Sequence, residues 1–200
     1  MDYYQPLLAE EKYHIVSRAT GSEKLFTEPE NYRFFLQRFD KYISPVADVF
    51  AYALLPNHFH FLLQATDISC ETVQLGQVVS NKLSNGFRLL LSEYAREFNI
   101  INSRTGSLFR QKTKAKNLSE IKDHNYPIMC FDYIHQNPVQ SGLCYQIDEW
   151  VYSSAPDYLK KRNGSICNQD LAFSLLEIPN DYFTRFDKPG FDNEIIKKLY

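Results

Sequence analysis

The sequence has no apolar run long enough to cross a membrane, and its first residues lack the basic start and apolar centre of a secretory signal peptide. Both absences favour a cytoplasmic protein that has no membrane partner. The four cysteines show no C-x-x-C spacing. They are therefore expected to be free thiols in a reducing compartment, and neither a zinc site nor a disulfide framework is predicted.

An excess of basic charge is also missing. The formal net charge is −2 and the sequence pI is about 6.2. A protein that coats nucleic acid through its overall charge is thereby excluded, so any binding of DNA has to come from a local basic patch. Apolar residues, in contrast, are plentiful: 44% of the 200 residues are hydrophobic and 15% are aromatic, which suffices for one domain with a buried core.

Hydrophobic periodicity predicts four strands and three helices in the order β, α, β, β, α, β, α. The expected strands are residues 12–19, 46–56, 58–66 and 108–118, and the expected helices are residues 28–43, 70–99 and 119–137. This order is typical of an α+β fold of the ferredoxin-like or RRM-like kind, an antiparallel sheet with helices packed mainly on one face. We assign residues 1–155 to this domain and residues 156–200 to a C-terminal extension of unknown role.

Turn and cap residues set the expected ends of these elements. The pair Pro56–Asn57 is compatible with a tight turn and predicts that the second and third strands form a hairpin. Thr27 and Ser119 are candidate caps of the first and third helices. Pro127 has to be absorbed as a kink or a break, and Pro138 is expected to end the third helix.

Two histidines stand one residue apart in the third strand. Side chains at alternate strand positions share a face, so His58 and His60 can converge on one ion, while Phe59, Phe61 and Leu63 face the core. A histidine on a strand is more often a structural residue than a metal ligand. The spacing alone therefore leaves both readings open.

The third helix carries a second candidate pair. Residues four apart lie on one face of a helix, so Tyr133 and Asn137 point the same way, whereas His135 points elsewhere. A tyrosine can act as a covalent nucleophile when its electrophile is polarised, for instance by a metal ion. The alternative, a tyrosine that only packs in the core, is favoured when the residue is considered by itself.

Basic residues concentrate in and before the last predicted strand. The densest run comprises Arg104, Arg110, Lys112, Lys114 and Lys116. In an extended strand the last four would share one face and form a track for phosphates, or they would merely keep an edge strand solvated. Arg18 and His14, on the first strand, are further residues that could face a nucleic acid, although a structural role for His14 is equally compatible with the sequence.

Five segments, taken together, resemble the HUH-type tyrosine transposases, in particular the branch associated with repetitive extragenic palindromes (REP). In chain order they read YHIVSRA, LLPNHFHFLL, GSLFRQKTKA, DYIHQNPVQSGL and EWVYSSAPDYL, and they span roughly Tyr13 to Leu159. Two features depart from the family pattern. Gln140 stands where the family often has arginine, and the Trp-Ser-Ser motif is stretched over residues 150–154.

The resemblance implies that residues 1–155 form a catalytic domain that cleaves and rejoins single-stranded DNA, at sites that form hairpins. Tyr133 would attack a phosphate and form a 5′-phosphotyrosine, and His58, His60 and Asn137 would hold Mg²⁺ or Mn²⁺. The partner would be single-stranded or hairpin DNA, bound by a monomer or a homodimer. Two alternatives stay open: a module that binds a DNA or RNA hairpin without cutting it, and a hydrolytic nuclease in which metal-bound water is the nucleophile.

Overall fold

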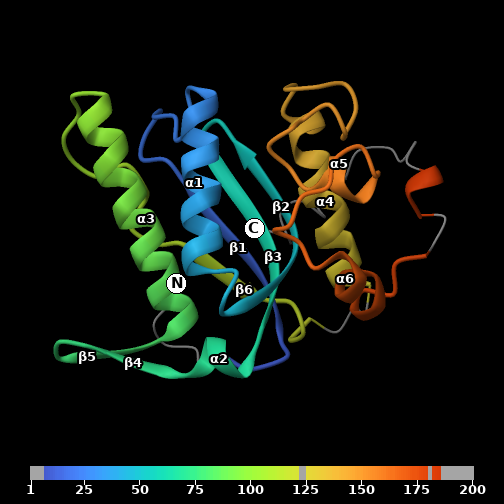
Figure 1. The fold of residues 1–200 in the computed structure, drawn as a ribbon, viewed down its shortest axis with the longest axis horizontal. Coiled ribbons are helices and arrows are strands. Elements are labelled where there is room, and N and C mark those ends of the chain that lie inside the picture. The colour runs from blue at the N-terminus through green and yellow to red at the C-terminus, as the bar shows by residue number, and fades with distance from the viewer. Residues whose placement is uncertain (1–6, 122–124, 180–181, 186–200) are drawn as a thin grey trace.

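A four-stranded antiparallel sheet forms the centre of the computed structural model, which describes residues 7–121, 125–179 and 182–185 (Figure 1). The strands are β1 (Lys12–Arg18), β2 (Ala47–Leu55), β3 (His58–Ala65) and β6 (Lys114–Asn117), and they are arranged in the order β2-β3-β1-β6. This is the strand order of the ferredoxin-like fold, because β3 lies between β1 and β2. The predicted α+β class, antiparallel sheet and β2–β3 hairpin are confirmed.

Two helices, α1 (Pro29–Tyr42) and α3 (Lys82–Ile101), lie side by side on one face of the sheet (Figure 1). They approach closely at Gly86, where an added Cβ would lie 2.6 Å from the carbonyl oxygen of Tyr42. Any larger residue at this position would push the helices apart. The pair therefore forms a tight layer over the aromatic core.

Aromatic side chains fill the space between α1 and the sheet. The Phe39 ring stacks on the Phe61 ring at a centroid distance of 4.0 Å, and Phe35 lies 5.1 Å from Phe59. Phe59, Phe61 and Leu63 are fully buried, as the alternation of the sequence predicts. The side chains of His58 and His60 consequently belong to the opposite face of the sheet.

The opposite face is covered by α4 (Tyr126–Gln140), with α5 (Ala155–Tyr158) and α6 (Gln169–Leu175) on the same side of the sheet (Figure 1). Nine consecutive residues of α4, Cys130–Pro138, are buried. One reason is that the C-terminal segments pack on α4: Phe131 contacts Tyr158 with ring centroids 4.9 Å apart. The 3-10 helix η1 (Tyr182–Arg185) lies against the same phenylalanine. None of the helices in the described part of the chain is long and apolar enough to cross a membrane.

The prediction of one helix over residues 70–99 is wrong in its first half. A short helix α2 (Asp67–Cys70) is followed by a hairpin of β4 (Thr72–Leu75) and β5 (Val78–Asn81), and α3 begins only at Lys82. The hairpin turn contains Gly76 with a φ of +62°, a conformation that favours glycine. Asn81 then caps α3, because its side-chain oxygen accepts a hydrogen bond from the backbone N–H of Ser84.

The ends of two other helices also differ from the prediction. Helix α4 begins at Tyr126 rather than near Ser119, because Pro127 sits in the first turn, where no backbone N–H is needed. Pro138 lies within the last turn, and the helix continues to Gln140. In α1 the cap position is Glu28 and not Thr27, whose hydroxyl donates to the side chain of Asn31. Residues 122–124 of the expected third helix lie outside the described residues.

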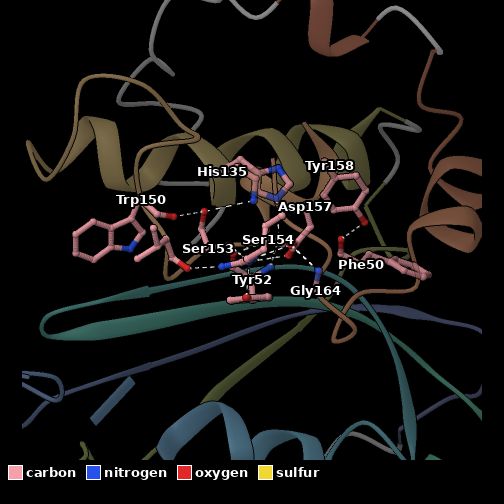
Figure 2. A network of polar contacts seen from close by, with 12 residues as sticks. Phe50, Tyr52, His135, Trp150, Ser153, Ser154, Asp157, Tyr158 and Gly164 are labelled. Atoms are coloured by element: carbon pink, nitrogen blue, oxygen red, sulfur yellow. Dashed lines mark hydrogen bonds and ion pairs between the residues drawn. The ribbon is translucent and has the colours of Figure 1, made fainter. Parts of the chain in front are cut away.

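The segment that contains the stretched Trp-Ser-Ser motif closes the β2 edge of the sheet. The backbone N–H of Leu54 donates to the carbonyl of Tyr152 at 2.9 Å, and Ser154 N–H donates to the carbonyl of Tyr52 at 3.0 Å. The Ser154 hydroxyl also lies 2.7 Å from Nε2 of His135 on α4 (Figure 2). One serine thus ties the tyrosine-bearing helix to the sheet.

An ion pair between the buried carboxylate of Asp157 and the partly exposed guanidinium of Arg162 holds this segment in place. Arg162 donates to both carboxylate oxygens of Asp157, at 2.7 and 2.6 Å, and to the Tyr52 hydroxyl at 3.0 Å. It also donates to the carbonyl of Ser153 at 2.7 Å. Figure 2 shows Tyr52, Ser153, Asp157 and Gly164 gathered at this point. The loop after α5 is therefore fastened directly to the edge of the sheet.

Candidate functional site

The predicted metal and tyrosine residues meet on the sheet face that α4 covers. Directly opposed residues of an antiparallel pair point to the same face, so the strand register fixes which side chains are neighbours. The opposed pairs on this face are Arg18–His58, Val16–His60, Val16–Lys114 and His14–Lys116. The face therefore combines imidazoles in its middle with cations toward the β6 edge.

His60 is at the centre of this arrangement and is fully buried. Its Nδ1 lies 2.9 Å from Nε2 of His14, and the two rings are stacked with centroids 5.1 Å apart. From α4, the Tyr133 ring meets His60 edge-on at 5.5 Å and His14 at 6.3 Å. Tyr133, the predicted nucleophile, is thus in contact with His60, a predicted metal ligand.

His58 lies next to His60, with ring centroids 5.0 Å apart. Its Nδ1 is 2.6 Å from Oδ1 of Asn57. Because that oxygen can only accept, Nδ1 must carry the ring proton of the neutral imidazole, and Nε2 keeps a free lone pair. The Nε2 atom is buried, and no described residue meets it in good hydrogen-bond geometry, although the Asn137 side chain faces this ring. A buried acceptor without a partner is costly unless it binds something else, such as a cation.

Burial keeps both histidines of the pair neutral. It lowers the pKa of His58 to about 4, helped by the nearby charge of Arg18 and opposed by the Asn137 side chain. The pKa of His60 is held well below its usual range by burial first, and then by His14 and His58. Since the neutral imidazole is the form that binds metals, the pair is ready for a cation at pH 7.

Asn137, the third predicted ligand, faces His58, whose pKa its side chain raises. It is nearly buried and lies one helical turn after Tyr133, with its Oδ1 3.4 Å from the Ser141 hydroxyl. Within the described ranges no three His, Cys, Asp or Glu residues are grouped to hold a metal ion. The set proposed here has two imidazoles and an amide oxygen, a mixture that Mn²⁺ or Mg²⁺ tolerates when other positions go to water or phosphate oxygens.

Beside this centre, the β6 edge of the sheet opens into a basic cavity. The predicted strand 108–118 is wrong before Lys114. Val16 pairs with Lys114 and Ala19 pairs with Phe109, so three steps along the first segment face five steps along the second. The two extra residues loop out of the ladder. A cavity of about 340 Å³ results, which is lined by Val16, Ser17, Arg18, Arg110, Lys112 and Lys114.

Two of the predicted basic residues lie outside this cavity lining. Arg104 follows the end of α3, where it bonds to Asn99 at 2.9 Å and pairs with Glu23 at 3.3 Å. Lys116 donates to the Tyr126 hydroxyl at 3.1 Å and lies over that ring. Of the predicted phosphate track, Arg110, Lys112 and Lys114 therefore line the cavity, whereas Lys116 contacts the first turn of α4.

The sequence does not reveal what Asn57 and His14 contact. Asn57 reads as a turn residue, although its position directly before His58 is a usable signal. His14 is a candidate for nucleic-acid contact or a structural role, but its partner His60 is distant in sequence. Only the register of β1 against β3 brings the two imidazoles together.

Comparison with known proteins gives a fold and no family. Neither the protein-family models nor the curated sequences match this chain. The fold, however, is known. A solved REP-associated tyrosine transposase bound to a REP hairpin superposes with a TM-score of 0.58 at 14% sequence identity, and the match covers 84% of this chain and 94% of that one. The chain therefore has the fold of that transposase.

Proposed function

We propose that the protein is a metal-dependent transesterase that cleaves and rejoins single-stranded DNA at hairpin-forming sites. The observation that carries this proposal is the placement of Tyr133 edge-on against His60, whose neighbour His58 faces the Asn137 side chain. A tyrosine that only packs in a core does not require such neighbours. The fold shared with a hairpin-bound tyrosine transposase supports DNA as the partner.

His58, His60 and Asn137 would hold Mg²⁺ or Mn²⁺ at the point where α4 meets β3. When bound, such an ion polarises the scissile phosphate and stabilises the departing oxygen. The protein contributes two imidazoles that burial keeps neutral. The Asn57 side chain, which holds Nδ1 of His58, orients one of them.

Tyr133 would supply the nucleophile. Its phenolic oxygen forms a bond to phosphorus and loses its proton, while the bond from phosphorus to the 3′ oxygen breaks and that oxygen leaves as a hydroxyl. The 5′-phosphotyrosine conserves the energy of the phosphodiester, so rejoining needs no nucleotide cofactor. Tyr133 is 1% exposed, and DNA therefore reaches it only when α4 or a covering segment is displaced.

Helix α4 is held on its own sheet through the bond between His135 and Ser154. This attachment supports a tyrosine that acts together with the histidines of the same chain.

The basic cavity at the sheet edge would bind the DNA backbone. Replacing both Lys112 and Lys114 with alanine removes two cations from the cavity, so hairpin affinity should fall. The slope of log affinity against log salt concentration should become shallower by about 1.4 to 1.8, because fewer counterions are released. Salt-titrated fluorescence anisotropy measures both effects.

Lys41→Ala is the matched control, because Lys41 lies on α1, across the sheet from the cavity. A double variant with the salt slope of the wild type would contradict this assignment.

The test of the proposed function uses labelled hairpin oligonucleotides with single-stranded flanks, taken from the genomic surroundings of the coding sequence. The full-length protein is incubated with Mn²⁺ or with EDTA and run on a denaturing gel. We expect a band of protein joined to DNA with Mn²⁺, and none with EDTA.

Other outcomes would support the alternatives. Cleavage without a joined band would indicate a hydrolase in which water replaces tyrosine. Binding without any cleavage would indicate a hairpin-binding module. Either result would overturn the proposed chemistry.

A further inference from the structure

We infer that His14 is a positioning residue, which fixes His60 in the tautomer that leaves Nε2 available to a metal ion. This inference rests on the proposed function, because it concerns one of the proposed metal ligands. His14 would not touch the metal or the DNA itself. It would act through the Nδ1 atom of His60.

The two imidazoles are held together by rigid and buried backbone. β1 and β3 pair without a bulge from Lys12–Gln64 to Arg18–His58, so the strands leave little freedom to the side chains between them. His14 is 1% exposed and His60 is fully buried. Water therefore cannot replace either partner in the 2.9 Å contact between Nε2 of His14 and Nδ1 of His60.

The chemistry of this contact selects one tautomer for a metal site. One of the two nitrogens in contact must donate a proton and the other must accept it. If His60 is to offer Nε2 as a lone pair, its proton is on Nδ1, and His14 must accept through an unprotonated Nε2. His14 then carries its own proton on Nδ1. In the opposite arrangement His60 would hold a proton on Nε2 and could not bind a cation there.

The neighbouring histidine shows the same arrangement. His58 also has its Nδ1 occupied, by the Oδ1 acceptor of Asn57, and no described residue meets its Nε2 in good hydrogen-bond geometry. Both imidazoles therefore have a partner side chain at Nδ1, and their rings lie 5.0 Å apart. Such partners of metal-binding histidines typically change metal affinity by about 10- to 100-fold when they are removed.

If His14 had a purely structural role, its substitution would affect metal binding differently. If His14 only fills space against His60 and Tyr133, an aromatic ring of similar shape should replace it without effect on the metal. If it acts as an acceptor, shape alone will not suffice. His14→Phe retains a planar ring and lacks the acceptor, whereas His14→Gln places an amide oxygen near the position of Nε2.

The experiment measures Mn²⁺ affinity by electron paramagnetic resonance, and the tautomer of His60 by long-range ¹H–¹⁵N NMR of the metal-free protein. We expect wild-type His60 to be protonated at Nδ1, and His14→Phe to weaken Mn²⁺ binding by about 10- to 100-fold. His14→Gln should stay within a few-fold of the wild type. Lys41→Ala is the control variant that should leave Mn²⁺ affinity unchanged, because Lys41 lies on α1, on the other face of the sheet.

The outcomes separate this inference from the proposed function. Mn²⁺ binding that is equally tight in His14→Phe, or a wild-type His60 protonated at Nε2, would overturn the role of His14 even if the protein cleaves DNA. If wild-type protein binds no Mn²⁺, the proposed function fails, and the NMR measurement still decides which tautomer His14 selects. If His14→Phe does not fold, the wild-type tautomer and the affinity of His14→Gln decide the matter.

Discussion

Tyr133→Phe is expected to lose the covalent DNA adduct completely on a denaturing gel, a reduction of at least about 10³-fold. The substitution removes only the oxygen that would bond to phosphorus and retains the ring that packs against His60. Hairpin affinity and Mn²⁺ affinity should therefore remain those of the wild type. Adduct yield, anisotropy and metal titration check the three parts separately.

Tyr126 provides a matched control on the same helix. It lies two turns before Tyr133 on the same side of α4, is also buried, and its hydroxyl accepts from Lys116. Tyr126→Phe should form the adduct at close to the wild-type level. A Tyr133→Phe protein that still forms adduct, or equal losses in the two variants, would show that Tyr133 is not the nucleophile.

Arg162→Met should lower the free energy of unfolding by about 1.5–3 kcal/mol, the usual contribution of hydrogen bonds to a charged group, because the guanidinium is itself 34% exposed and partly screened by water. Asp157 is only 3% exposed and would keep its carboxylate without the guanidinium that neutralises it. The bonds of Arg162 to Tyr52 and to the carbonyl of Ser153 would be lost as well. Urea unfolding followed by circular dichroism measures the change.

The adjacent lysine offers a comparison with a more exposed cation. The Lys161 side chain is 60% exposed and pairs with Asp148, whose side chain is 11% exposed. Lys161→Met should change stability by about 1 kcal/mol or less, as is typical of exposed ion pairs. Similar effects of the two substitutions would mean that the Arg162 network does not hold the C-terminal segment on the sheet.

The central strands could be predicted because their sequence patterns fit a strand and no other element. In residues 58–66 histidine alternates with phenylalanine, two leucines follow, and Pro56–Asn57 marks the turn before them. The β4–β5 hairpin could not be separated from a helix in the same way. Val73, Leu75, Val78 and Val79 also fit helical spacing, and only Gly76 signalled a turn.

The parts of the site that could be predicted are those set by the geometry of a single strand or helix. The spacing of His58 and His60 on a strand, and of Tyr133 and Asn137 on a helix, fixes which pairs share a face. The contact of His14 with His60 depends on the register between strands that are far apart in sequence. The two extra residues between Phe109 and Lys114, which shape the basic cavity, depend likewise on where β6 pairs with β1.

The most direct test of the central claim is to map the residue that carries the DNA. The adduct formed with Mn²⁺ is digested with a nuclease and a protease, and the modified peptide is sequenced by tandem mass spectrometry. We expect one peptide from α4 that carries a nucleotide remnant, joined through its 5′-phosphate to the oxygen of Tyr133. A remnant on any other residue, Tyr126 included, would contradict the assignment of the nucleophile.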